Sequence, residues 1–129
     1  MIVDASAIVA IMLDEPEGRA LAARIEAEAV RLTHAISVFE AAQAVARQWR
    51  RALPDVQQDL REFLSLADID VVEIGSAEAN AAIEASARYG KGRHPAALNL
   101  GDCFSYACAR LRSMPLLYKG DDFSRTDLA

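Results

Sequence analysis

The chain has little cysteine, glycine and proline for its 129 residues, and each shortage excludes a class of protein. Its two cysteines, Cys103 and Cys108, lie in a helical pattern at a spacing that points them to different faces, so neither a disulfide nor a paired-cysteine metal site is expected. A reducing, cytoplasmic setting follows from this cysteine usage. Six glycines and four prolines, without any low-complexity segment, predict no disordered linker.

Long apolar runs and excess basic charge are also missing. The apolar stretch at residues 5–13 lies between Asp4 and Asp14, and no basic segment precedes it, so we expect neither a signal peptide nor a membrane span. Acidic residues outnumber basic ones by 19 to 14, which gives a net charge of −5. Such a chain does not hold nucleic acid by phosphate contacts alone, so a polyanionic ligand would require local basic residues or a metal ion.

What remains is the composition of a globular protein, with 53% hydrophobic residues and a length that fits one domain spanning residues 1–129. Short apolar runs alternate with longer amphipathic segments. Strands are expected at 2–3, 31–34, 71–74 and 115–118, and helices at 5–13, 17–29, from Ser37 to Trp49, after Pro54, 76–88 and 99–112. This alternation predicts an α/β sandwich with a small, mostly parallel central sheet.

Four separated acids are the most informative residues. Asp4, Glu40, Asp102 and Asp121 each fall where an apolar segment ends or a helix is expected to begin. Because the carboxyl ends of parallel strands meet at one edge of a sheet, these side chains can converge there. Oxygen ligands of this kind suit Mg²⁺, whereas two distant histidines and no cysteine cluster make a zinc site a poor fit.

Each acid also has a structural explanation. The sequence from Ser37 to Glu40 is a capping box, in which Glu40 would bind the first amide of the helix. Asp102 lies three residues after Asn99, a good N-cap, and Asp4 is itself suited to cap a helix that begins at the next residue.

Three further features remain open on the sequence alone. Asp121 and Asp122 are adjacent in a turn, and either is able to be the fourth acid. Ser6 either binds a carboxylate or metal-bound water, or is an ordinary first-turn serine. The loop near residue 91 carries a local cluster of bases, of which we expect Lys91 and Arg93 to contact phosphate; a solvated loop is the alternative. The cluster consists of Arg88, Lys91, Arg93 and His94.

Three segments, at residues 1–8, 89–107 and 115–127, carry a resemblance that runs nearly the full length of the chain. On these segments the chain resembles the PIN-domain ribonucleases, and within them the VapC-type toxins of bacterial toxin–antitoxin pairs. The resemblance implies a compact α/β fold with a small parallel sheet, an acidic pocket for Mg²⁺ or Mn²⁺, and endonucleolytic cleavage of RNA.

The resemblance also implies roles for residues and partners. Asp4, Glu40 and Asp102 match the first three acids of the family motif, and Asp121, with Asp122 as the alternative, matches the fourth. A homodimer is implied, together with a cognate VapB-type antitoxin of a type II pair that blocks or enters the pocket.

Two other functions compete with this interpretation. A phosphoacceptor receiver domain would require paired acids after the first strand and an Asp after a central strand, but one Asp follows Val3 and Gly75 follows Ile74. A non-catalytic α/β binding or dimerisation module would use the same acids merely as caps and turn residues.

Overall fold

Four short strands form one parallel sheet in the order β3-β2-β1-β4, in a computed structural model that describes residues 1–128. The strands are β1 (Ile2–Val3), β2 (Leu32–His34), β3 (Asp70–Val72) and β4 (Leu116–Leu117). Ile2 lies opposite Leu32 on one side and Leu116 on the other, and every neighbouring pair is parallel. The α/β class and the parallel sheet are therefore confirmed, and all four strands end at the same edge.

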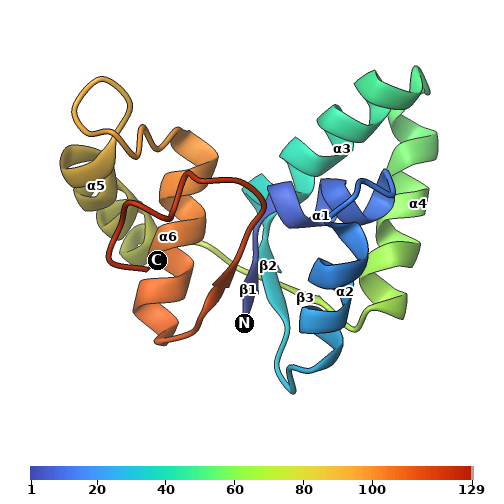
Figure 1. Cartoon of the computed structure of the whole chain (residues 1–129), viewed down its shortest axis with the longest axis horizontal. Coiled ribbons are helices and arrows are strands. Elements are labelled where there is room, and N and C mark those ends of the chain that lie inside the picture. The colour runs from blue at the N-terminus through green and yellow to red at the C-terminus, as the bar shows by residue number, and fades with distance from the viewer. Residues whose placement is uncertain (129) are drawn as a thin grey trace.

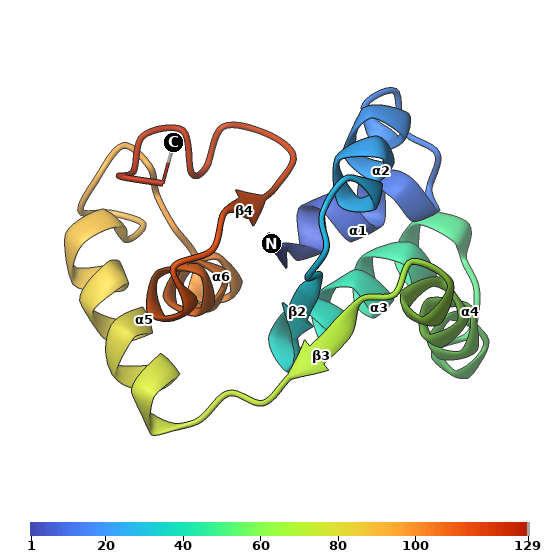
Figure 2. The same cartoon turned by 90° about the horizontal axis from the view of Figure 1, so that it is seen from below.

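Helices cover both faces of the sheet. Figure 1 shows α5 and α6 on one side and the other four on the opposite side, and the view from below in Figure 2 shows the sheet between the two groups. The helices are α1 (Ala5–Met12), α2 (Gly18–Glu26), α3 (Ala35–Trp49), α4 (Leu53–Leu66), α5 (Ser76–Tyr89) and α6 (Leu100–Arg112). None of the helices within residues 1–128 is long and apolar enough to cross a membrane.

The paired strands β1 and β4 explain why the sheet needs cover on both faces. Successive strand residues point to opposite faces, so Ile2 and Leu116 join the core beneath α5 and α6. Val3 and Leu117 join the other core, with α1 and its neighbours. Each of these four residues is buried, which is the pattern of a parallel sheet enclosed between helices.

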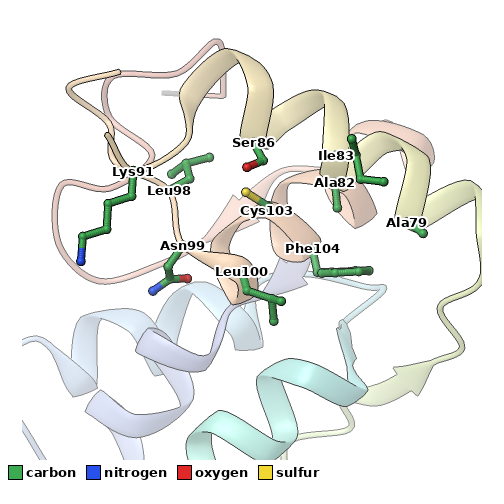
Figure 3. A pocket seen from close by; sticks show the side chains of 10 residues that line it. All are labelled: Ala79, Ala82, Ile83, Ser86, Lys91, Leu98, Asn99, Leu100, Cys103 and Phe104. Atoms are coloured by element: carbon green, nitrogen blue, oxygen red, sulfur yellow. The ribbon is translucent and has the colours of Figure 1, made fainter. Parts of the chain in front are cut away.

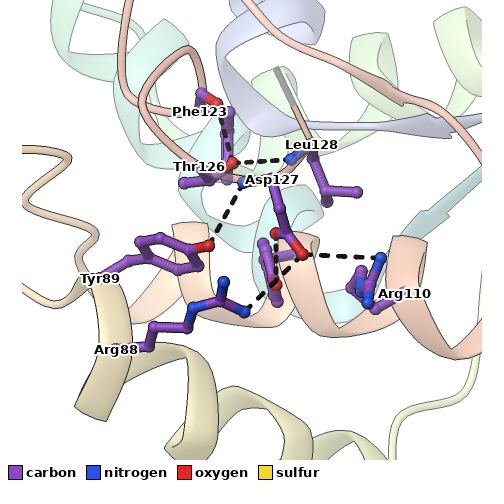
Figure 4. A network of polar contacts seen from close by, with 8 residues as sticks. Arg88, Tyr89, Arg110, Phe123, Thr126, Asp127 and Leu128 are labelled. Carbon is purple, nitrogen blue, oxygen red and sulfur yellow. Dashed lines mark hydrogen bonds and ion pairs between the residues drawn. The ribbon is translucent and has the colours of Figure 1, made fainter.

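A network of polar contacts holds the C-terminal segment against α6 (Figure 4). The Tyr106 hydroxyl donates to Asp127 at 2.7 Å, and the Asp127 amide donates to the Tyr89 hydroxyl at 3.3 Å. Arg110 and Arg88 approach the same carboxylate at 3.7 and 3.8 Å. These contacts fix the far end of the turn segment that follows β4, and that turn carries Asp121 and Asp122.

Candidate acidic site

Asp4 follows β1 directly and both of its carboxylate oxygens are engaged. Oδ2 accepts the Ser6 amide at 3.0 Å and the Ser6 hydroxyl at 2.7 Å, so Asp4 caps α1. The Ser6 hydroxyl in turn accepts the Lys119 amide at 3.0 Å, which connects it to the segment after β4. Ser6 therefore lies in the first turn of α1 and also orients the Asp4 carboxylate. Asp4 is 5% exposed.

Asp102 has the capping role that its sequence position allows, and it is also surrounded by other acids. Its carboxylate accepts the Asn99 amide at 3.1 Å, while the Asn99 side chain accepts the Asp102 amide at 3.0 Å, a capping box at the start of α6. Yet burial raises the pKa of Asp102 to about 7, in spite of the favourable amide contact, and the charges of Asp4, Asp122 and Glu40 contribute. The cap therefore does not relieve the repulsion from three other acids.

Glu40 does not belong to the capping box that its sequence suggested, and this prediction is wrong. Helix α3 begins at Ala35 rather than Ser37, because His34 is the N-cap and accepts the Ser37 amide. Ser37 is a buried residue of the first turn rather than the N-cap, so it cannot form a capping box with Glu40. The Glu40 carboxylate is free of that role, and burial together with the Asp4 charge raises its pKa.

The Glu40 carboxylate occupies the space that a side chain at Gly101 would fill. A Cβ atom at residue 101 would overlap Glu40 Oε1 and approach its Cδ at 2.6 Å. The absence of a side chain at Gly101 therefore lets Glu40 from α3 lie against the first turn of α6, next to Asp102. The glutamate reaches across from one face of the sheet to the other at the edge where the strands end.

Of the two turn acids, the electrostatics favour Asp122. Partial desolvation and the charges of Asp4 and Asp121 raise the pKa of the Asp122 carboxyl, although the residue as a whole is exposed. Asp122 in turn contributes to the raised pKa of Asp102. Asp121 acts on Asp122 but is absent from the causes that raise the pKa of Asp102 and Glu40.

No basic side chain compensates this group of acids. Among the ion pairs within residues 1–128, none involves Asp4, Glu40, Asp102 or Asp122. In the same range no three His, Cys, Asp or Glu side chains are arranged as a ready-made metal cluster. Mg²⁺ requires no such cluster, because it keeps several waters and takes one or two carboxylates directly. An all-oxygen, uncompensated set of donors fits a hard cation.

A groove of about 500 Å³ opens beside the acids. Ser6 and Glu40 lie on its wall, and Arg47 and Lys119 bring positive charge to it. Lys119 is paired with Glu15 and lies 3.7 Å from Glu17, whereas Arg47 forms no ion pair within residues 1–128. Arg47 could not be singled out from the sequence, because helical spacing does not reveal which exposed base borders a groove.

The basic cluster of the loop divides into two pairs. Arg88 approaches Asp127 and lies 4.8 Å from the Tyr89 ring, and His94 accepts the Ala96 amide at 3.0 Å, so both have structural contacts. Lys91 and Arg93 are exposed and form no ion pair in the described part of the chain. Figure 3 shows Lys91 on the rim of an apolar pocket between α5 and α6, on the side where Asn99 begins α6.

Two buried residues of the site escaped the sequence analysis. Ser105 donates to Asp4 Oδ1 at 2.5 Å, and His34 contacts Ser105 at 2.9 Å. Ser105 follows Asp102 by three residues on α6, which places both on one helix face, so helical spacing would have pointed to it. His34 was expected merely as a strand residue, and no spacing rule connects it to Asp4.

Known proteins give independent information on the family. The family model described as PIN domain matches residues 1–128. Ribonuclease VapC30 of Mycobacterium tuberculosis is 40% identical over 129 residues, covering 100% of this chain and 96% of its own length. Ribonuclease VapC of Mycolicibacterium smegmatis is 41% identical over 129 residues, covering 100% and 98%.

A solved structure agrees at the level of the fold. A chain of a toxin-antitoxin complex from Klebsiella pneumoniae superimposes with a TM-score of 0.70 and 17% identity, covering 98% of this chain and 92% of its own. Identity this low supports the fold alone, whereas the relatives at 40% and the full-length family match establish the lineage. This chain belongs to the PIN-domain family and is one of its VapC-type members.

Proposed function

We propose that the protein is a magnesium-dependent endoribonuclease that acts as the toxin of a type II toxin–antitoxin pair. One observation carries the proposal: the charges of Asp4, Glu40 and Asp122, which come from separate elements, raise the pKa of Asp102, and none of the four forms an ion pair within residues 1–128. Relatives at 40% and 41% identity bear the name ribonuclease, which supports the reaction class.

We assign Asp4, Glu40 and Asp102 to cation binding, with Asp122 in preference to Asp121 as the fourth acid. Bound Mg²⁺, or Mn²⁺ in its place, supplies Lewis-acid polarisation of a phosphodiester and a lower pKa for bound water. Ser6 and Ser105 hold the two oxygens of Asp4 in place. Asp102 and Glu40 contribute negative charge that a cation would offset, and burial with the charges of the other acids raises the pKa of Asp102 to about 7.

For the RNA strand, we infer two sources of phosphate contact. Lys91 and Arg93 are exposed cations on the loop before α6, and Arg47 lies on the wall of the groove that contains Glu40. Phosphate contacts of this kind fix a strand without selecting its sequence. The acidic chain as a whole would otherwise repel RNA.

Two partners belong to the proposal. A VapB-type antitoxin would inhibit the enzyme by covering or entering the acidic site.

The second partner is another copy of the same chain, because a homodimer would bury exposed apolar side chains. Phe39, Leu53 and Val71 line a second groove of about 480 Å³ and are 64%, 47% and 49% exposed, which suits an interface. Light scattering on the isolated protein tests the dimer, because a monomer at micromolar concentration would contradict it.

The test of the activity is cleavage of single-stranded RNA with Mg²⁺ or with a chelator. We expect cleavage by the wild type with Mg²⁺ alone, and a loss of at least about 100-fold in Asp102→Asn. Asp55→Asn, an exposed acid in the first turn of α4, is the matched control and retains full activity. Equal cleavage by wild type and Asp102→Asn would refute the proposal, and a wild type that neither cleaves nor binds Mg²⁺ would favour the non-catalytic module.

A further inference from the structure

Three polar side chains are fully buried next to Asp4, and only Ser105 among them has a role in the function proposed above. His34, Ser37 and Ser105 are each 0% exposed, at the end of β2, in α3 and in α6. Burying such groups costs about 1–3 kcal/mol each unless they are hydrogen-bonded. Within residues 1–128 no buried side-chain nitrogen or oxygen lacks a partner, so this cluster is fully satisfied.

The hydrogen bonds of the cluster have one possible direction. An ionised Asp4 accepts only, so the hydroxyl of Ser105 must donate to Oδ1, at 2.5 Å. Ser105 has then used its proton, and its 2.9 Å contact with His34 Nε2 requires Nε2–H to donate. The proton of the imidazole is therefore on Nε2.

The other side of the ring agrees. His34 Nδ1 accepts the Ser37 amide at 3.4 Å as the N-cap of α3, so Nδ1 carries no proton. Burial lowers the pKa of His34, against the Asp4 charge that raises it, which favours the neutral ring. One neutral tautomer satisfies both contacts at once.

We propose that His34 is a positioning residue that sets the cation affinity of the acidic site by orienting Asp4 through Ser105 and by fixing the start of α3, which carries Glu40. The inference rests on the proposed metal site. Ser105 shares α6 with Asp102, so the imidazole connects the three elements that supply Asp4, Glu40 and Asp102.

The first experiment measures Mg²⁺ affinity by calorimetry at a temperature where every variant is folded. His34→Asn keeps an N-cap but is too short to reach Ser105, and Ser105→Ala removes the donor to Asp4. We expect each to weaken Mg²⁺ binding by about tenfold, as for other residues that orient metal ligands. The double variant should bind Mg²⁺ no more weakly than the single variant with the lower affinity, because His34 and Ser105 act on Asp4 through the same hydrogen bonds.

Ser37→Ala is the matched control. It removes a buried hydroxyl 3.1 Å from His34 Nε2 but leaves both bonds of the chain to Asp4, so we expect less than about a twofold change. A tenfold loss in Ser37→Ala as well would overturn the inference, because the effect would then be general core damage. If His34→Asn does not fold, Ser105→Ala and Ser37→Ala together still decide.

The second experiment does not involve the metal. Nitrogen NMR of the imidazole in the metal-free protein should show the Nε2–H tautomer for His34, whose signals are those missing from His34→Asn. The Nδ1–H tautomer would overturn the inference regardless of metal affinity. A wild type that binds no Mg²⁺ overturns the proposed function as well, whereas a wild type that binds it as tightly as both variants overturns this inference alone.

Discussion

Asp102, in the first turn of α6, and Asp127, which packs against the same helix, have opposite environments. Asp127 accepts the Tyr106 hydroxyl and faces Arg110 and Arg88, and these contacts hold its pKa below the usual range. Asp102 has no cation nearby, and burial with the charges of other acids raises its pKa to about 7. The protein therefore supplies positive charge to the acid that stabilises the fold, and none of its ion pairs within residues 1–128 involves Asp102.

The largest expected effect is on RNA cleavage, and it distinguishes Asp122 from Asp121 as the acid that acts together with Asp102. Because Asp122 contributes to the raised pKa of Asp102 and Asp121 does not, Asp122→Asn should reduce RNA cleavage by about 10- to 100-fold. Asp121→Asn should change it by less than about twofold. The measurement is the single-turnover rate at saturating Mg²⁺, and the reverse order would return the fourth position to Asp121.

The second prediction concerns the free energy of unfolding of the metal-free protein, on which the charges of Asp102 and Asp127 have opposite effects. A raised pKa means that the charged form of Asp102 destabilises the fold increasingly from about pH 4 to pH 7, so Asp102→Asn should stabilise the protein by about 1–2 kcal/mol at pH 8. The lowered pKa of Asp127 means that its contribution is present above about pH 4 and is lost as the pH falls. Asp127→Asn should therefore destabilise at pH 8, by no more than about 1 kcal/mol.

Chemical denaturation at pH 8 and pH 4.5 in a chelator measures both effects. The difference between Asp102→Asn and the wild type should shrink at the lower pH, where the wild-type carboxyl is protonated. If Asp102→Asn is less stable than the wild type at pH 8, the inference that the Asp102 carboxylate is uncompensated and destabilises the fold is wrong.

The third prediction concerns what Mg²⁺ adds. A cation bound to the folded state alone stabilises it by RT ln(1 + [L]/Kd), which is about 1.4 kcal/mol at tenfold excess over Kd. The wild type and Asp127→Asn should both gain this amount, and Asp102→Asn should gain little. Thermal unfolding over a Mg²⁺ titration measures it; an equal gain in all three proteins would place the cation elsewhere.

The smallest expected effect is on RNA binding. Replacing both Lys91 and Arg93 by Ala should weaken RNA affinity by about three- to tenfold, and Arg47→Ala by a similar or smaller factor, with a shallower salt dependence in each. Mg²⁺ affinity should not change, because none of the three contacts the acids. Fluorescence anisotropy in Ca²⁺ at several salt concentrations measures it. An unchanged affinity in the loop variant would leave Arg47 as the inferred contact.

The sequence predicted the parts of the fold that local pattern controls. Alternating apolar runs placed all four strands and six helices to within a few residues, and topology predicted where Asp4 would lie. The start of α3 was misplaced because Ser37 has the local signature of a cap, whereas the cap is His34, whose ring also contacts Ser105 of α6. The choice between Asp121 and Asp122 had the same difficulty, since a turn allows both and only the folded structure shows which charge acts on Asp102.

The contact between Gly101 and Glu40 links two positions that are far apart in the sequence. Neither residue alone identifies an active member of the family, because glutamate is common on helix surfaces and glycine has no chemistry. Together they form a joint signature that is readable in any related sequence. A relative with a side chain at the position of Gly101 must hold its glutamate carboxylate elsewhere, because that side chain would occupy the space where the Glu40 carboxylate lies in this protein.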